Sequence, residues 1–328
     1  MMVLLASSLF SGTVNTLALD AIAVHAMHER HRVIIEDDRN SNFLQWLHSL
    51  SPDHREQWDF AINRGYQLEA REPARRTITI VPTETSDWRA NPPLVSLNEA
   101  VTFLNRPFHV ILEDAVSDRN FLLKMATVEQ RSTLLVQENK GIVIFENGDG
   151  ITSMPRRIET IRQEGQISIL RCWVMFDSDA LRPNVPSDQS ERLKSKCLET
   201  GLPFHQLQRR SIESYLPLPA LSGWAYNERK YRAVRHPIFQ AYSAMSKVQK
   251  HHYNLKNGFE ADAKRQGSNA GDLYEDLEQA QKVPLLKGFG SDIGALFSTE
   301  HVAEVHLRRD GGWSEINPVI TNLMAILR

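Results

Sequence analysis

With 328 residues the chain is long enough to bury the cores of two or three modest domains. Its 41% hydrophobic and 24% charged residues are typical of a globular protein and exclude a disordered, collagenous or membrane-spanning chain. The formal net charge of −2 excludes a general electrostatic attraction to nucleic acid, so any phosphate contacts must come from a local basic patch.

The chain begins with an uncharged stretch, residues 1–19. A secretory signal carries positive charge before its apolar run, but here no Lys or Arg precedes Arg30. Ser, Thr, Asn and Gly interrupt the stretch and make it too polar for a membrane span. We therefore expect a buried strand followed by a helix. The two cysteines, Cys172 and Cys197, form neither a disulfide framework nor a zinc motif, which favours a cytoplasmic location.

Residues 1–105 mix helical and strand patterns and are predicted to form an α/β domain. A helix is expected near Thr16 to Arg32, then a strand in VIIE and a second helix in FLQWLHSL. The alternating run Thr77 to Val81 predicts another strand. Four acidic residues leave open a second, PIN-like acidic site, although solvated surface and helix caps are the ordinary interpretation: Asp20, Glu36, Asp37 and Asp38.

From residue 106 the pattern becomes strand, acidic turn and helix, repeated. Apolar runs predict strands at 108–112, 141–145 and 169–176, with helices from residue 119 and over residues 158–164 and a flexible glycine loop at 147–150. Such alternation favours a parallel sheet covered by helices on both faces. After Pro217 and Pro219 the chain is predicted to be mostly helical. The expected division is thus 1–105, 106–220 and 221–328.

Two acidic clusters follow predicted strands. Glu113 ends the first strand and Asp118 lies in the first turn of the next helix, whereas Asp177 and Asp179 leave the third strand. Functional groups collect at the carboxyl ends of parallel strands, so the clusters should meet there. Because side chains alternate along an extended segment, Asp177 and Asp179 should face the same way. A single strand-end Asp-x-Asp is a common feature, but two such clusters in one sheet indicate a site for Mg²⁺ or Mn²⁺ that acts on phosphodiester bonds.

Four segments in order resemble the Toprim domain of nucleases of the overcoming-lysogenization-defect (OLD) type. ILEDAVSDRNFL resembles the first Toprim motif and WVMFDSD the second, and GIVIFENGDGI between them resembles the middle strand and its glycine turn. LQRRSIESYLP is similar to the Arg-x-x-Glu-x-Tyr-Leu element that follows the sheet, which falls on Arg210, Glu213 and Tyr215. The resemblance covers about residues 106–220 and implies a Toprim-like fold.

The resemblance implies a Mg²⁺-dependent endonuclease. Glu113 would be a metal ligand or general base and Asp177 and Asp179 metal ligands, while Asp118 and Glu213 would complete a second cation position. OLD-type sites also include a lysine after the sheet. Lys256, in HHYNLKNGF, is the candidate because Gly258 indicates a structured turn, and Lys287, in LLKGFG, is the alternative.

The chain departs from the family at one position of the first motif. The family has Gly directly after the first Glu, where this chain has Asp114. Asp114 is either an extra metal ligand or a sign that metal binding has changed.

A basic segment without acidic residues runs from Arg229 to Lys256. Its cations are suited to backbone phosphates, and the aromatics Tyr231, Phe239, Tyr242 and Tyr253 to stacking on unpaired bases. The alternative is a solvated helix face above core aromatics. With the motif arginine included, the residues predicted to bind nucleic acid are Arg210, Arg229, Lys230, Arg232, Arg235, Lys247 and Lys250.

Many OLD-type nucleases carry an ABC-family ATPase, but no G-x-x-x-x-G-K-[ST] phosphate loop occurs in this chain. Similar stand-alone Toprim proteins are anti-phage defence effectors, so the resemblance implies a nuclease acting on DNA or RNA under control of a separate ABC-type ATPase. Two alternatives stay open: a catalytically degenerate Toprim regulatory or scaffold subunit, and a primase-like nucleotidyl transferase. The oligomeric state, a homo-oligomer included, is also open, and no membrane partner is expected.

Overall fold

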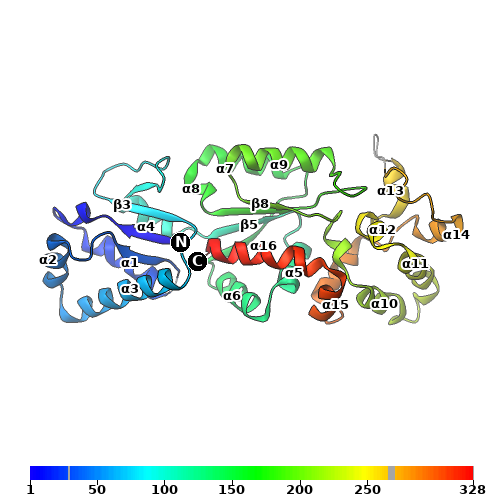
Figure 1. Cartoon of the computed structure of the whole chain (residues 1–328), viewed down its shortest axis with the longest axis horizontal. Helices are drawn as coiled ribbons and strands as arrows, with labels where there is room; N and C mark the ends of the chain where they lie inside the picture. The colour runs from blue at the N-terminus through cyan, green and yellow to red at the C-terminus, as the bar shows by residue number, and fades with distance from the viewer. Residues whose placement is uncertain (29, 265–269, 328) are drawn as a thin grey trace. The chain divides into compact units, whose positions relative to one another are not determined.

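The structure, a computed structural model, describes residues 1–28, 30–264 and 270–327 (Figure 1). The chain divides into two compact units. Unit 1 comprises Met1–Phe108, Gly165–Arg171 and Thr321–Arg328, and unit 2 comprises His109–Glu164 and Cys172–Ile320. The expected boundary at residue 105 therefore falls close to the end of the first segment of unit 1. Residues 221–320, predicted as a separate helical region, belong to the same unit as the second sheet.

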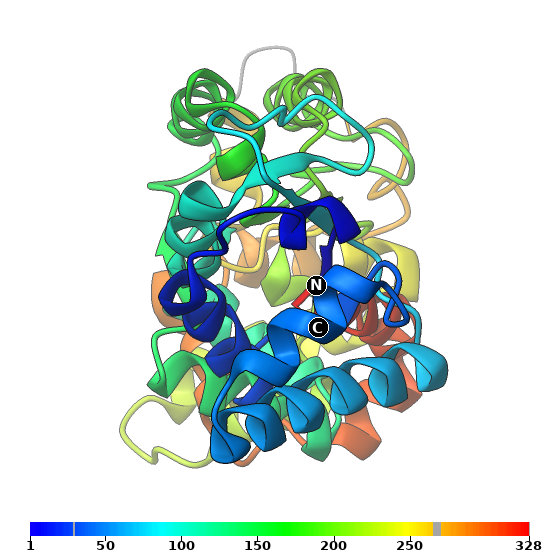
Figure 2. The ribbon, with the colours of Figure 1, turned by 90° about the vertical axis from the view of Figure 1, so that its left-hand side faces the viewer.

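Unit 1 is built on a four-stranded sheet in the order β2-β1-β3-β4, shown from the side of this unit in Figure 2. All its strand pairs are parallel. The strands are β1 (Met2–Leu5), β2 (Arg32–Ile35), β3 (Thr77–Val81) and β4 (Leu94–Ser96). The helices are η1 (Ser7–Phe10), α1 (Thr16–Met27), α2 (Ser41–Ser49), α3 (Pro52–Arg71), α4 (Leu97–Asn105) and α8 (Gln166–Ile169).

The apolar runs of the sequence form the core of unit 1. Val3, Leu5, Ile78 and Ile80 are fully buried. The predicted strand and helix at the start of the chain are confirmed, but α1 ends at Met27 and the next strand already begins at Arg32. The helix was predicted too long because the polar residues 28–31 contain no Gly or Pro that would mark a helix end in the sequence.

Unit 2 holds a second four-stranded sheet in the order β6-β5-β7-β8. β5 pairs in parallel with β7, and β7 with β8. The strands are β5 (Phe108–Leu112), β6 (Val143–Asn147), β7 (Cys172–Phe176) and β8 (Phe204–Gln206). Helices α7 (Met154–Glu164) and α9 (Asp188–Thr200) cover one face, and α5 (Ser117–Met125) and α6 (Val128–Asn139) the other (Figure 1). The predicted α/β class, with parallel strands flanked by helices, is confirmed.

The described part of the chain after β8 consists of α- and 3₁₀-helices joined by turns and loops, so the predicted mostly helical character is confirmed. Its elements are η2 (Ile212–Tyr215), α10 (Leu218–Tyr226), α11 (Arg232–Ala244), α12 (Lys247–His252), α13 (Gly258–Lys264), α14 (Gln279–Lys282), η3 (Val283–Leu285), η4 (Ser291–Ser298), α15 (Glu304–Asp310) and α16 (Gly312–Leu327). Among the described helices, none combines the length and apolar character needed to cross a membrane.

One glycine sets how closely a helix of unit 1 approaches the sheet. Gly65 lies inside α3, and a Cβ atom built there would overlap the Val33 carbonyl group of β2. Gly223, inside α10, has no heavy atom nearer than 3.4 Å to the equivalent position. The two glycines therefore form a matched pair.

We predict opposite effects of alanine at these two positions. Gly65→Ala should lower the free energy of unfolding by about 1–3 kcal/mol because the helix must move off the strand. Gly223→Ala should raise it by about 0.5–1 kcal/mol because alanine restricts the unfolded chain and fits without strain. Urea unfolding followed by circular dichroism measures both. A stabilised Gly65→Ala variant would contradict the close contact of α3 with β2.

Candidate acidic active site

The two predicted acidic clusters meet at one edge of the second sheet. Glu113 directly follows β5 and Asp177 directly follows β7, its parallel neighbour. The Asp177 backbone N–H donates a hydrogen bond of 2.6 Å to Glu113 Oε1. The prediction that carboxylates from two separate strands converge is therefore confirmed.

A turn after β5 positions Asp118. This residue lies in the first turn of α5, is 6% exposed, and its Oδ2 accepts a 3.1 Å hydrogen bond from the Asp114 backbone N–H. The exposed Asp114 side chain accepts from the Val116 N–H at 2.8 Å and from Ser117 Oγ at 2.6 Å. Partial burial tends to raise the pKa of Asp114, but these hydrogen bonds outweigh it and lower the pKa. The residue that departs from the Toprim pattern thus closes the turn into α5.

The glycine loop after β6 holds the backbone at Glu113. The Gly148 N–H donates to the Leu112 carbonyl at 2.6 Å, and the Gly150 N–H to the Glu113 carbonyl at 3.1 Å. A Cβ atom on Gly148 would lie 2.8 Å from the Leu112 oxygen, so only glycine fits. The loop predicted to be flexible is in fact a fixed support of the site.

The Asp-x-Asp segment bends instead of extending the strand. β7 ends at Phe176, Asp177 Oδ1 accepts a 3.2 Å hydrogen bond from the Ile212 N–H, and Asp179 has a φ of 51°. The Asp179 N–H donates to the Arg210 carbonyl at 2.8 Å. A left-handed residue breaks the alternation of an extended segment, so the reason given for Asp177 and Asp179 facing the same way is wrong.

Glu213 and Lys256 join the group from the helical part of unit 2. The Glu213 side chain, fully buried in η2, has Oε1 2.9 Å from Lys256 Nζ, and its Oε2 accepts a 2.7 Å hydrogen bond from Ser211 Oγ. Lys256 is 39% exposed and can therefore also face a substrate. The sequence analysis did not single out Ser211, although it lies inside the Arg-x-x-Glu motif.

The backbone at Lys256 is held where two glycine-containing turns cross each other. The Phe289 N–H donates to the Leu255 carbonyl at 2.6 Å and the Gly290 N–H to the Lys256 carbonyl at 3.1 Å. Both candidate lysines lie at this crossing. Of the two, Lys256 forms the ion pair with Glu213, whereas Lys287 is exposed. The order of preference between the two lysines agrees with the geometry.

The carboxyl groups repel one another in a largely buried space. Burial raises the pKa of Glu113 to about 7, assisted by the charge of Asp179. Burial and the charges of Glu113 and Glu213 raise the pKa of Asp118 to about 8. Burial, Glu113, Glu213 and Asp118 raise the pKa of Asp177 well above its usual value. Burial acts to lower the pKa of Lys256, but the surrounding carboxylates outweigh it and raise the pKa. Glu113, Asp118, Asp177, Glu213 and Lys256 are called the acidic group below.

The acidic group fits a divalent cation in donor chemistry and charge. Within residues 1–28, 30–264 and 270–327, no three Asp, Glu, His or Cys side chains are arranged closely enough to hold a metal ion as they stand. The donors are nevertheless carboxylate oxygens, which Mg²⁺ and Mn²⁺ prefer. Burial is the largest cause of the three raised carboxyl pKa values, and repulsion from neighbouring carboxylates adds to it even beside Lys256. A further cation would relieve the remaining repulsion.

A distant 3₁₀ helix closes the site over Glu213. A Cβ atom built on Gly294, in η4, would lie 2.9 Å from Glu213 Oε1 and 3.5 Å from the Ser117 Cβ atom. Gly294 therefore keeps the carboxylate of Glu213 in place from a segment 81 residues further along the chain (294 − 213). Sequence reasoning missed this residue because a lone glycine in SDIGALF has no pattern that connects it with a carboxylate.

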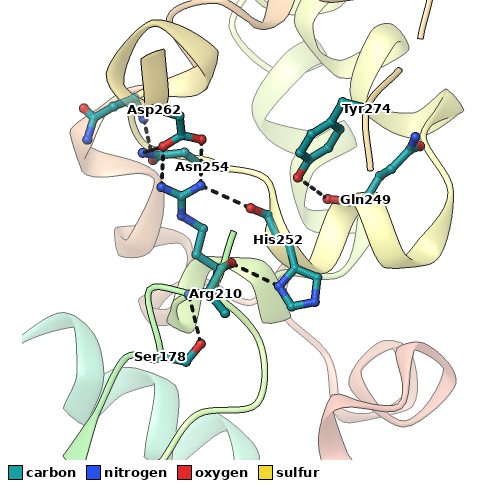
Figure 3. A network of polar contacts seen from close by, with 9 residues as sticks. Ser178, Arg210, Gln249, His252, Asn254, Asp262 and Tyr274 are labelled. Carbon is teal, nitrogen blue, oxygen red and sulfur yellow. Dashed lines mark hydrogen bonds and ion pairs between the residues drawn. The ribbon is translucent and has the colours of Figure 1, made fainter. Parts of the chain in front are cut away.

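Arg210 does not have the role predicted for it. It is 3% exposed, and its guanidinium donates to the two carboxylate oxygens of Asp262 at 2.7 and 2.5 Å and to the His252 carbonyl at 3.2 Å (Figure 3). Asn254 and Asp262 also lie side by side there (Figure 3). Arg210 is thus a buried tie between the segment after β8 and helices α12 and α13, and phosphate contact by this residue is ruled out by its burial.

The remaining predicted basic residues fall into two sets. Arg229, Lys230, Arg232 and Lys247 are exposed. Arg235 pairs with Glu228 at 2.9 Å and donates to the Trp224 carbonyl, and Lys250 donates to the Ser243 carbonyl at 2.8 Å, so these two serve local structure.

The aromatic residues of the basic segment are mostly not free to stack on bases. Tyr242 and Tyr253 are buried at 2% and 0% exposure, so their predicted stacking is wrong. Tyr231 is 42% exposed and carries the Lys230 ammonium 4.5 Å from its ring centre. The segment thus combines an exposed basic end with a set of core aromatics.

The acidic residues of unit 1 have local partners. Asp20 accepts from the Trp58 indole N–H at 3.0 Å, Glu36 from the Ser7 N–H at 2.8 Å, and Asp37 from the Arg39 N–H at 3.0 Å. These contacts are those of caps and surface ties, and Asp38 is exposed, which agrees with the ordinary interpretation of the four residues.

No protein-family model, curated protein sequence or solved structure matches the chain. The functional assignment therefore depends on the four sequence segments and on the geometry of the acidic group.

We predict that removing one carboxylate stabilises the metal-free protein. In the native state the pKa of Asp118 is about 8 against an ordinary value of 3.8, so the native state binds more protons than the unfolded state between these pH values. The free energy of unfolding should therefore fall as the pH rises through this window. Asp118→Asn should reduce this dependence, to which Glu113 and Asp177 also contribute, and raise the stability at pH 8 by on the order of 1–3 kcal/mol.

The measurement is urea unfolding in EDTA at pH 5 and pH 8. Asp59→Asn, at an exposed site on α3, is the control and should behave as the unaltered protein. An Asp118→Asn variant less stable than the unaltered protein at pH 8 would mean that the carboxylates do not repel one another.

Proposed function

We propose that the chain is a metal-dependent endonuclease that hydrolyses phosphodiester bonds in DNA or RNA. The observation that supports this most is the convergence of the acidic group at the carboxyl edge of a parallel sheet, with Lys256 beside Glu213. Carboxylates concentrated against their own repulsion cost stability, and such arrangements are characteristic of functional sites.

The residues that would hold Mg²⁺ or Mn²⁺ are Glu113, Asp118, Asp177 and Asp179. A bound cation would polarise the phosphoryl group and make water acidic enough to attack at neutral pH. Glu113 would either hold the cation or accept the proton of the attacking water. Lys256 is placed to stabilise negative charge on the phosphoryl oxygens, and Glu213 orients it.

The exposed basic residues support a nucleic-acid substrate. Arg229, Lys230, Arg232 and Lys247 offer cations to backbone phosphates, which hold a strand in position without reading its sequence. They supply the local positive patch that a chain of net charge −2 needs for this purpose.

The proposal extends to a role in anti-phage defence, under the control of a separate ABC-type ATPase. The resemblance of four ordered segments to OLD-type Toprim nucleases supports this role, together with the lack of a phosphate-loop motif in the sequence.

A catalytically degenerate regulatory or scaffold subunit is the second candidate. It is favoured by one observation: among the described residues the carboxylates do not stand as a ready group of three metal ligands. Isothermal titration with Mg²⁺ and Mn²⁺ separates the two functions, because a scaffold would bind neither ion at the acidic group.

We predict that Glu113→Gln and Asp177→Asn each reduce Mg²⁺-dependent cleavage by about 10²-fold or more, because each removes a charged oxygen ligand or base. Purified protein is incubated with plasmid, single-stranded DNA and total RNA, with Mg²⁺ or Mn²⁺ and then with EDTA. Glu129→Gln, at an exposed position in the first turn of α6, is the matched control and should cleave normally. EDTA-sensitive cleavage that survives both site substitutions would place the activity elsewhere.

We predict that Gly294→Ala reduces kcat by about tenfold and leaves KM for the nucleic acid unchanged. The added Cβ atom, 2.9 Å from Glu213 Oε1, must displace the carboxylate that orients Lys256. Gly223→Ala controls for the general effect of alanine in place of glycine. Unaltered kcat in Gly294→Ala would show that the position of Glu213 does not matter for the reaction.

A further inference from the structure

A polar pocket lies near the Asp-x-Asp segment in unit 2. It has a volume of about 500 Å³ and is lined by the loop after β7, the segment after β8, α12 and the start of α16. Its lining residue Arg209 precedes Arg210, whose carbonyl accepts the Asp179 N–H. A second cavity of about 590 Å³ shares Asn184 and Gln208 with the first and is also lined by Ser178, which stands between the two aspartates of the Asp-x-Asp segment. We call the first cavity the side pocket.

Three of the four charged side chains in the wall of the side pocket, Arg209, Asp310 and Glu315, have protein partners, and the fourth, Lys247, is exposed. The Arg209 guanidinium donates to the Ser214 carbonyl at 2.8 Å, forms an ion pair with Asp310, and lies 4.4 Å from the Tyr215 ring centre. Glu315 accepts from the Tyr215 hydroxyl at 2.6 Å and from the Gln208 N–H at 2.9 Å. The formal charges of Arg209 and Lys247 balance those of Asp310 and Glu315, which suits a neutral polar ligand better than an anion.

The side pocket also presents polar groups without protein partners. Among the described residues, the carboxamides of Asn184 and Gln208 make no hydrogen bond, and His251 Nε2 is buried and unpartnered. Burial, together with Arg209, Lys247 and His252, lowers the pKa of His251 to about 3, so its ring is neutral at pH 7. Pro183 and Val248 add apolar surface.

We propose that the side pocket binds a single unpaired nucleobase of the strand whose phosphodiester bond lies at the acidic group. The inference rests on the proposed nuclease function. A volume of 500 Å³ falls within the range of small-ligand sites, about 300–1,000 Å³. Carboxamides and a neutral imidazole match the mixed donors and acceptors on the edge of a base, and apolar walls match its faces.

The proposal defines the substrate class. A base in a duplex has its pairing edge occupied and its faces stacked, so it cannot enter a pocket without being extruded. Single strands and loops offer such a base at little cost. The preferred substrate should therefore be single-stranded or looped nucleic acid, cut next to the bound base.

The test uses the full chain in EDTA and uncharged probes, the four ribonucleosides and the four deoxyribonucleosides, with ribose 5-phosphate for comparison. Isothermal titration should show binding of at least one nucleoside. Gln208→Ala should weaken this binding about tenfold, as expected for the loss of one hydrogen bond. His251→Ala is the second variant and should weaken it similarly. Gln240→Ala, at an exposed position on α11, is the matched control.

Several outcomes would overturn the proposal. Binding of ribose 5-phosphate without binding of any nucleoside would make the pocket a phosphate site. Absence of nucleoside binding, or binding that neither Gln208→Ala nor His251→Ala weakens, would also reject it. Comparison of ribonucleosides with deoxyribonucleosides indicates whether the base comes from RNA or DNA.

A second measurement separates this inference from the proposed nuclease function. If the chain cleaves nucleic acid, Gln208→Ala should raise KM for a single-stranded oligonucleotide about tenfold and leave kcat unchanged. An abasic nucleotide beside the cleavage position should have the same effect on the unaltered protein. Nucleoside binding without cleavage under any metal condition would reject the nuclease function and retain the pocket, whereas cleavage without nucleoside binding would do the reverse.

Discussion

Repulsion among buried carboxylates is the constraint around which unit 2 is organised. Glu113, Asp118 and Asp177 all have raised pKa values because they are removed from water and close to one another. Such a group disperses unless the backbone holds it. Here main-chain N–H groups donate to all three side chains, from Asp177, Asp114 and Ile212 respectively. Backbone hydrogen bonds therefore hold these carboxylates in place. They act against the repulsion among the carboxylates, which the ammonium group of Lys256 reduces only in part.

Glycines stand where the site needs close approach. At Gly148 a Cβ atom would meet the Leu112 carbonyl, at Gly258 the Leu285 carbonyl, and at Gly294 the Glu213 carboxylate. Each glycine brings one element against another that carries a functional side chain, namely Glu113, Lys256 or Glu213. The geometry of the acidic group is thus set by backbone contacts from three separate parts of the chain, and larger residues at these points would shift the functional side chains even though they touch no substrate.

Local sequence patterns predicted part of the site correctly and failed for the rest, and the failures have a physical reason. Short apolar runs predicted β5 and β7 and hence Glu113 and Asp177 at their ends, and a helix start predicted Asp118. Arg210 was misassigned because its partner Asp262 is 52 residues away and no periodicity links them. The argument for Asp179 failed because one left-handed residue ends the alternation. Helices α3 and α9 were missed because they are polar, so their apolar positions are few. Long-range pairing and single backbone angles leave no trace in local spacing.

The acidic group and the side pocket suit two different parts of one nucleotide. The group concentrates negative charge, so it attracts a phosphate only through a cation, and that cation must displace protons. Since the pKa values of Glu113 and Asp118 are about 7 and 8, cation binding releases protons near neutral pH, and the apparent affinity for the cation rises as the pH rises through this range. The formal charges in the side pocket balance and His251 is neutral, so binding of a base there involves no proton release at this pH. The affinity for the cation should therefore depend on pH near neutrality, whereas the affinity for the base should not. A site with these two parts can hold the base while the protonation of the carboxylates beside the phosphate changes.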